Sequence, residues 1–213
     1  GRMLYWPKAT YRLHATPTIT GLHGWGWEME PGSLLEVNDA STHFLNATDC
    51  NDLVFRGLRL DGLIGGGTAN GKLDINGGAG FLFENCHFAR CYGIKAEYGA
   101  SDGAVVNCRF DRTVVVLQIG QGGSPKDATR PISYDWRVLG GYAEAVVAEA
   151  IEANYRFRNL SVIGMHFLDC SATGEQAMDI GGGDCGDVVV ANNILEFSGR
   201  SSVTPTTLQA ILI

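Results

Sequence analysis

The sequence predicts an all-β solenoid, with three short strands per coil and about 28 residues in each coil. Three observations support this prediction: a high glycine content, a six-residue pattern that recurs at near-constant spacing, and short apolar–polar alternation without a helical stripe. Glycine accounts for 29 of the 213 residues, roughly twice its average share, and only six prolines accompany it. Such a composition is typical of a chain rich in turns and β structure.

The recurring pattern reads apolar, any residue, Asn or Gly, apolar, polar, apolar. Its third position falls at residues 57, 85, 107, 135, 164 and 192, so successive copies begin 22 to 29 residues apart. Self-similarity at such a period indicates a repeat architecture.

Each copy is followed by a further strand-like segment. These segments cover residues 72–76, 93–98, 115–119, 145–149, 176–180 and 208–213. The strands are too short to form a sandwich of hairpins, so we expect each to pair in parallel with its equivalent one coil later. The stretch 142–153, rich in Ala and Glu, is interpreted as strand plus loop, with a short helix as the alternative.

The third position of the pattern marks a tight turn. Asn85, Asn107 and Asn192 occupy it in three copies, with Gly57, Asp135 and Gly164 in the others. Asn and Gly tolerate the left-handed conformation that such a turn requires. We expect Asn85 and Asn107 to stack directly on neighbouring coils.

The first and third residues after this turn are expected to face the interior. The inward set is Leu58, Leu60, Cys86, Phe88, Cys108, Phe110, Trp136, Val138, Met165 and Phe167. Cys86 and Cys108 then stack as small buried hydrophobic side chains. A disulfide between them is the less favoured alternative, because parallel stacking gives the side chains a poor relative geometry.

Composition also excludes several classes of protein. No apolar run approaches the ~20 residues that a membrane-spanning helix needs, so we expect no membrane insertion. A net charge of −7 and a pI near 5.1, without any block of Lys and Arg, argue against nucleic acid as a partner. The six cysteines form no CxxC pair, which argues against zinc.

The chain resembles a known architecture from its first residues. Residues 2–13 run from an apolar strand through Pro7 and an Ala-Thr-Tyr turn into a second strand, and a Gly-rich turn follows at 21–26. With the coil pattern, these segments resemble the right-handed parallel β-helix of the pectate-lyase superfamily. The resemblance implies a right-handed single-stranded parallel β-helix forming one domain over residues 1–213, with opening coils at 1–50 and regular coils at 51–213.

Many members of that superfamily cap the first coil with an amphipathic helix. This sequence offers no candidate for such a cap, and it ends in an apolar strand-like segment at 208–213. A bare apolar strand edge invites aggregation. We therefore expect residues 1–213 to be a fragment of a longer chain.

Outward residues at equivalent positions of successive coils form columns, and two columns carry polar chemistry. The first follows the Asn turn and contains Arg59, His87, Arg109, Arg137 and His166. Stacked like charges repel unless an anion neutralises them. Either nearby carboxylates neutralise this column, which is the structural interpretation, or it binds an acidic polymer through its arginines.

The second column lies on the last strand of each coil, where the resemblance implies a sugar-binding groove. The candidate catalytic residues are Asp74, Glu97, Asp179 and Lys95, and Gln118 is a candidate for substrate binding. Carboxylates on neighbouring coils lie about 5 Å apart and those on alternate coils about 10 Å, which brackets the separations that glycosidases use. We expect Asp74 to face Glu97; a solvated polar strand face is the alternative.

Lyase chemistry is a second option for the same column. Lys95 and the arginines would neutralise a uronate while a base removes the adjacent proton. The Asp-Pro-His of related epimerases and the Asn-Thr-Asp of related polygalacturonases are absent from the sequence.

No metal or other cofactor is expected, and calcium is the alternative left open. The resemblance implies clustered acidic ligands for calcium, and only Asp179, Asp184 and Asp187 offer such a group, in a Gly-rich segment that favours a plain turn. Trp25 and Trp27 flank Gly26 in an expected loop, where Trp25 is a candidate to stack on a sugar and Trp27 alternatively covers the open first coil. The segment 121–131 is the longest insertion and is expected to overhang the groove.

Two classes of function follow. One is a carbohydrate-active β-helix, either a glycoside hydrolase or a polysaccharide lyase. The other is a structural and receptor-binding module, such as part of a phage tail spike or fibre, or an extracellular adhesin, which binds a cell-surface glycan without cleaving it. The second class implies a homotrimer, and both imply an extracellular or virion-associated setting.

Overall fold

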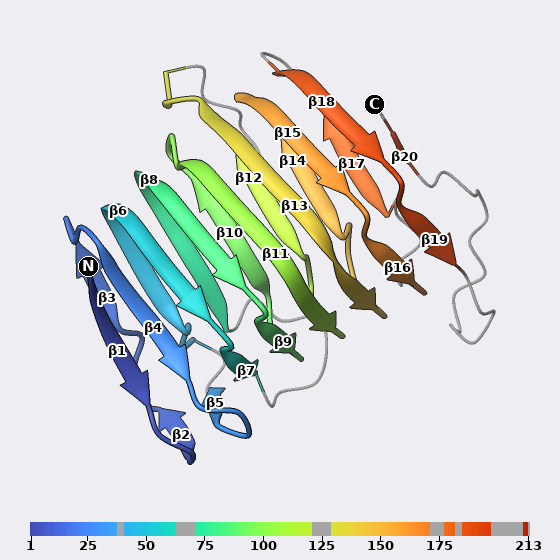
Figure 1. Ribbon diagram of the computed structural model, residues 1–213. Helices are drawn as coiled ribbons and strands as arrows, with labels where there is room; N and C mark the ends of the chain where they lie inside the picture. Colours follow the sequence, from blue (N-terminus) through green and yellow to red (C-terminus); the bar gives the residue numbers. More distant parts are fainter. Residues whose placement is uncertain are drawn as a thin grey trace.

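The computed structural model of the chain describes residues 1–37, 41–62, 71–120, 129–170, 177–181, 185–196 and 211–212. Every regular element within these ranges is a β-strand (Figure 1). The described residues accordingly include no helix long and apolar enough to cross a membrane. Most of the expected long loop, residues 121–128, lies outside the described residues.

The strands form three series, in each of which a strand pairs with the next member of its own series. The first series comprises β1 (Arg2–Trp6), β4 (Trp25–Met29), the later parts of β6 (Leu45–Arg56) and β8 (Lys72–Glu84), the earlier parts of β11 (Ser101–Asp111) and β13 (Ser133–Glu144), β15 (Phe157–Ile163) and β18 (Cys185–Ala191). The second series comprises β2 (Thr10–Leu13), β5 (Leu34–Val37), β7 (Arg59–Asp61), β9 (His87–Ala89), the ends of β11 and β13, β16 (His166–Leu168) and β19 (Ile194–Glu196). The third series comprises β3 (Thr18–Thr20), the starts of β6 and β8, β10 (Gly93–Glu97), β12 (Leu117–Gly120), β14 (Ile151–Asn154), β17 (Met178–Gly181) and β20 (Ile211–Leu212).

All of these pairings are parallel, and they join residues that lie 21 to 34 positions apart along the chain in most of the repeats. The chain passes through the first, second and third series in turn and then returns to the first. In Figure 1 the first series runs side by side from β1 to β18, with the short second-series strands continuing from its ends. The result is an all-β protein with one large parallel sheet that does not close into a barrel, an arrangement compatible with a solenoid.

The predicted stacking of Asn85 and Asn107 is confirmed. Glu84 pairs with Val106 and His87 with Arg109, so the two asparagines occupy equivalent positions on neighbouring strands. Both have left-handed backbones, with φ of 53° and 49°. The turn therefore uses the one conformation for which asparagine is unusually well suited.

The predicted register is wrong in the fourth copy of the pattern. Cys108 pairs with Gly141, so the neighbour of Asn107 is Gly140, with φ of 64°, and not Asp135. Asp135 instead marks a second left-handed corner, at the start of the first series. Equivalent corner positions are held by Asp52, Gly80, Asp102, Asn159 and Asp187. The segment 133–138 matches the six-residue pattern by residue type, but the inserted residues before it lengthen this coil.

Burial confirms most of the predicted interior. Leu58, Leu60, Cys86, Phe88, Cys108, Phe110, Met165 and Phe167 are all at most 6% exposed. Trp136 and Val138 are buried too, but they belong to the first series rather than the second, as the corrected register requires. The indole Nε1 of Trp136 donates to the backbone oxygen of Ala100 at 2.9 Å, which satisfies the buried N–H.

Aromatic side chains stack through the interior at the spacing of the strands. The rings of Trp27 and Phe55 lie 5.0 Å apart and those of Phe55 and Phe83 lie 4.8 Å apart, nearly parallel in both cases. Phe88 and Phe110 repeat this arrangement at 4.8 Å. These values match the ~4.8 Å between paired strands, so each strand adds one ring to a continuous column.

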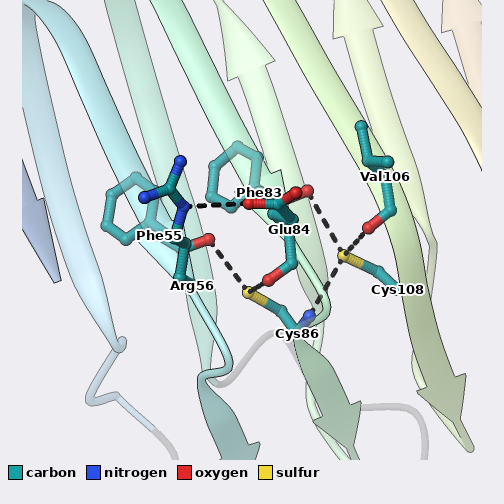
Figure 2. A network of polar contacts seen from close by, with 7 residues as sticks. All are labelled: Phe55, Arg56, Phe83, Glu84, Cys86, Val106 and Cys108. Atoms are coloured by element: carbon teal, nitrogen blue, oxygen red, sulfur yellow. Dashed lines mark hydrogen bonds and ion pairs between the residues drawn. The ribbon is translucent and has the colours of Figure 1, made fainter. Parts of the chain in front are cut away.

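The six cysteines are free thiols. Figure 2 shows Cys86, in the turn between β8 and β9, beside Cys108 on β11, and the backbone N–H of Cys86 donates to Sγ of Cys108 at 3.4 Å. Each thiol also lies 3.4–3.5 Å from two backbone oxygens: Phe55 and Glu84 for Cys86, and Phe83 and Val106 for Cys108. The hydrogen bond with Cys86 and burial raise the pKa of Cys108. Both side chains are thus buried, as expected, and no disulfide joins them.

The interpretation of 142–153 as strand plus loop is confirmed, with a different strand boundary. β13 ends at Glu144, and the next strand is β14 (Ile151–Asn154) rather than residues 145–149. The segment between them forms no helix. This shift changes which residues reach the outer face of the third series.

Candidate functional site

The third series presents polar side chains on its outer face in two adjacent columns. In several of its strands a buried apolar residue lies between two polar residues of the outer face, as in Lys95-Ala96-Glu97, and Gly120 and Gly181 take the second of these positions on β12 and β17. Parallel register then aligns the polar residues of successive strands. We call this set the polar ladder: Asn46, Asp74, Asn76, Lys95, Glu97, Gln118, Glu152, Asn154 and Asp179.

At the β6–β10 end, the polar ladder combines amides with an ion pair. The amide of Asn76 donates to Oδ1 of Asn46 and to Oδ1 of Asp74, both at 3.4 Å. Nζ of Lys95 lies 3.0 Å from Oε2 of Glu97, whose side chain is only 5% exposed. A buried carboxylate needs such a partner, because burial alone disfavours its charge.

At the β12–β17 end, hydrogen bonds link the members of the ladder in a chain. The hydroxyl of Tyr92 donates to Oε1 of Gln118 at 2.8 Å, and Nε2 of Gln118 donates to Oε2 of Glu152 at 2.9 Å. Nδ2 of Asn154 donates both to Oε1 of Glu152, at 3.4 Å, and to Oδ2 of Asp179, at 3.2 Å. The amide of Asn154 therefore bridges two carboxylates. These carboxylates belong to neighbouring strands, whose backbones are ~4.8 Å apart.

Partly buried cationic and aromatic groups flank the ladder at its β8 end. Nζ of Lys72 lies 5.1 Å from the centre of the Tyr92 ring. Burial lowers the pKa of Lys72, and the nearby charge of Lys95 adds to this effect. Burial likewise lowers the pKa of His43, with Lys72 as the next cause. For Tyr92, burial and then Glu152 raise the pKa, so its hydroxyl stays protonated as a donor.

The predicted facing of Asp74 and Glu97 is wrong. Asp74 pairs with Lys95, whereas Glu97 pairs with Asn76. The loops between strands differ in length, so residue type alone left the register uncertain by two positions along the strand. Asp74, Lys95, Gln118 and Asp179 nevertheless share one column, and Glu97 lies in the column beside it.

Glu152 is a member of the site that the sequence reasoning missed. It lies between Gln118 and Asp179 in the column, a position that the expected strand at 145–149 assigned to other residues. A signal was available: Glu152-Ala153-Asn154 has the same polar, small apolar, polar order as Lys95-Ala96-Glu97. The alternation of this triplet fits a half-buried strand better than 145–149 does.

The first predicted column is only partly assembled. Arg59, His87 and Arg109 are aligned on the second series, but the next strand contributes Tyr142, followed by His166. Arg137 is wrongly placed in the prediction, because the corrected register puts it on the first series between Ala104 and Ser161.

Carboxylates accompany the cations of this second-series face. Arg109 pairs with Glu144 at 3.7 Å, and Nε2 of His166 lies 3.1 Å from Oε2 of Glu196. Arg90 makes two hydrogen bonds to Asp61. This pairing favours the structural interpretation of the column over a track for an acidic polymer.

Trp25 lies away from the polar ladder. It belongs to β4 and lines an apolar cavity of about 350 Å³ at the β1 end of the molecule, together with Trp6, Trp27 and other apolar side chains. The guanidinium of Arg2 lies 5.7 Å from the Trp25 ring. Trp25 and Trp27 thus lie on a strand and not in the expected loop, and both line the apolar cavity at the β1 end.

The described residues contain no group of three or more His, Cys, Asp or Glu side chains arranged to hold a metal ion. Of the three acids considered for calcium, Asp179 lies on β17 and Asp187 on β18, and Asp184 lies outside the described residues.

Comparison with known proteins gave no match to a protein-family model, a curated protein or a solved structure.

Protonation of His87 is expected to destabilise the fold as the pH falls. Its Nε2 is buried and has no hydrogen-bond partner, and burial, Arg109 and Arg59 lower its pKa. The unfolded chain, with an ordinary histidine pKa of about 6.5, then binds more protons than the folded chain below that pH. The contribution of neutral His87 to the free energy of unfolding is therefore fully present above about pH 6.5. It declines as the pH falls towards the lower pKa of His87 in the folded chain.

Urea unfolding at pH 7.5 and at pH 5 measures this effect. His87→Asn should lose less stability between the two pH values than the original chain, and His14→Asn, at an exposed position, should lose as much as the original chain. His43 contributes in the same direction, so the dependence is reduced rather than abolished. Equal pH dependence in both variants would contradict this assignment.

Proposed function

We propose that the chain is a right-handed parallel β-helix of the pectate-lyase type that binds a polysaccharide along the polar ladder. The proposal rests on one observation, the continuity of the ladder: hydrogen-bonding side chains follow one another on successive third-series strands from β6 to β17. A linear row of carboxylates and amides, repeated every ~4.8 Å, is suited to an extended polymer rich in hydroxyl groups.

The two ends of the ladder suit different parts of such a ligand. Lys95 and the partly buried Lys72 lie near the β8–β10 end, where they favour an acidic substituent. Glu152 and Asp179 lie at the other end, where they accept hydrogen bonds from neutral sugar hydroxyls. The ligand class is therefore a polysaccharide with neutral residues and at most isolated acidic groups.

The same geometry supports cleavage by hydrolysis. Glu152 and Asp179 lie on neighbouring strands, ~4.8 Å apart, close to the ~5–5.5 Å that separates the two carboxyl groups of retaining glycosidases. In that reaction one carboxyl group protonates the leaving oxygen while the other attacks the anomeric carbon; the first then activates the water that releases the product. Glu152 and Asp179 are the pair for which this chemistry is proposed.

Binding without cleavage is the second candidate, with the chain acting as a receptor-binding module. It is favoured by the way the carboxylates are held: Glu152 accepts hydrogen bonds from both Gln118 and Asn154, and Glu97 pairs with Lys95. Fixed acceptors of this kind recognise hydroxyl donors without any proton transfer. An extracellular or virion-associated setting accords with both candidates.

A glycan array tests the shared part of the two candidates. We expect the purified chain to bind a polysaccharide, and Lys95→Gln to weaken the binding about tenfold or more, since a charged hydrogen bond contributes about 1.5–3 kcal/mol. Arg59→Gln, which removes the same charge from the exposed second-series face, is the matched control and should leave binding unchanged. Absence of binding, or an equal loss in both variants, would refute the proposed location.

A further inference from the structure

The outer face of the first series carries a row of apolar side chains among its charged ones. Val54, Leu82, Val106, Leu139, Ile163 and Val189 lie on it, and we call these six residues the apolar stripe. The corresponding face of the third series carries charged and amide side chains, and that of the second series carries mainly charged ones with Leu168 and Ile194 among them. Alternation along each strand places the stripe opposite the buried aromatic columns.

The register makes the stripe continuous. Val54 pairs with Leu82 and Leu82 with Ala104. In the adjacent column, Val106 pairs with Leu139 and Leu139 with Ile163. The stripe thus passes from one column to the next in the middle of the molecule.

Exposed apolar residues extend the stripe to both ends of the first series. Met3 and Tyr5, on β1, are 44% and 58% exposed, and Val189, on β18, is 49% exposed. Among the residues that the structure describes, β1 and β18 are the outermost strands of the series. An occupant that covers the stripe must therefore be as long as the series itself, which excludes a short peptide.

Some of the charged side chains on the face are paired. Arg56 pairs with Glu84 at 2.9 Å (Figure 2), and Glu28 and Arg137 lie in the same two columns. The corner at the start of the first series adds Asp52, Asp102, Asp135 and Asp187 along one edge of the face.

We propose that the apolar stripe is the surface through which the chain associates with a second copy of itself. A second copy presents a face of the same length, with strands at the same ~4.8 Å spacing. When two such faces pack together, the apolar side chains of both stripes become buried. Homo-oligomers are the commonest assemblies of soluble proteins, and a shared face gives a closed pair. Self-association through this face leaves the polar ladder uncovered and is independent of the proposed function.

The size of the face is sufficient for a stable pair. Eight strands at ~4.8 Å spacing span roughly 34 Å, and a strand of five residues is about 17 Å long, which gives about 570 Å² of flat area. Because side chains project from the strands, the accessible area of the face is larger than its flat area and approaches the ~800 Å² that each partner contributes to a standard interface.

Sedimentation equilibrium over a range of concentrations tests the proposal. The chain has a mass of 22.8 kDa, and we expect a self-associated species of at least twice that mass. Leu82→Lys and Leu139→Lys combined should return it to the monomer, because a buried lysine opposes association. Leu168→Lys, the same change on the outer face of the second series, is the matched control and should associate as the original chain does.

Circular dichroism and thermal unfolding establish that each variant is folded. If the double variant does not fold, the milder Leu139→Gln replaces it, with an expected weakening of association of about tenfold. A monomeric original chain at every concentration would overturn the proposal. Association that survives the stripe variants, or that is lost equally in Leu168→Lys, would also overturn it.

Discussion

Replacement of Gly141 by alanine is expected to lower the free energy of unfolding by roughly 2–5 kcal/mol. Gly141 has φ of 111°, a backbone conformation that residues with a side chain rarely adopt. A Cβ at this position would lie 2.3 Å from the backbone oxygen of Cys108 and 3.1 Å from its nitrogen. The expected cost combines a left-handed backbone, at ~1–2 kcal/mol, with a clash that the neighbouring strand must relieve, at ~1–3 kcal/mol.

Gly186→Ala is the matched control for this prediction. A Cβ on Gly186 would meet only Nη1 of Arg158, at 3.6 Å, an ordinary contact with a flexible side chain. We expect its stability to stay within about 0.5–1 kcal/mol of the original, as for other tolerated substitutions. Urea unfolding of both variants measures the difference, and equal stabilities would contradict the pairing of Gly141 with Cys108.

Glu152→Gln is expected to have the largest effect on function, a fall of about 10²–10⁴-fold in the rate of polysaccharide cleavage. The carboxamide keeps the size of the side chain, but it can neither transfer a proton nor attack the anomeric carbon. Asp179→Asn should have a comparable effect, and the double variant should be little worse than either single variant, because two groups that act as a unit are not additive.

Asp74→Asn provides the control for the cleavage prediction. Asp74 belongs to the same column as Glu152 but lies three strands away, roughly 14 Å by strand spacing. At a saturating concentration of a polysaccharide that the chain binds, reducing-end release should therefore be nearly unchanged in Asp74→Asn, because Asp74 contributes to binding and not to the chemical step. Unchanged release in Glu152→Gln would remove hydrolysis by this pair, and binding without cleavage would then remain as the proposal.

The sequence carried most of the information about the repeat. Asn85, Asn107 and the buried residues that follow them lie where the pattern predicts, because each tight turn needs a left-handed residue and each coil needs inward apolar side chains. Both requirements concern single positions, so the residue type at each position reflects them directly. They predict the existence of the strands and their inward faces.

Register between coils was harder to predict, since it depends on loop length rather than on residue type. The segment 133–138 satisfies the same apolar and polar pattern as the true equivalent, 138–143, in which Gly140 and Gly141 replace an Asn-Cys pair. This single misalignment moved Arg137 to the wrong face. A shifted strand boundary in the same coil hid Glu152.

The apolar stripe was missed for a related reason. Val106 and Ile163 fall at the second position of the pattern, where any residue was accepted and where Arg56 and Glu84 stand in other copies; Val54, Leu82 and Val189 directly precede the pattern and were not considered. Only the three-dimensional register shows that these positions share one outer face. The polar ladder was partly predicted because each of its charged residues is a candidate for binding or catalysis by its side-chain type alone.

Backbone nuclear Overhauser effects between neighbouring strands test the central claim, that residues far apart in the chain become neighbours in parallel register. On a uniformly labelled sample, we expect cross-strand contacts that link Cys108 with Gly141 and Val106 with Leu139. Contacts between antiparallel neighbours joined by a hairpin, or contacts that align Phe110 with Val138, would contradict the account.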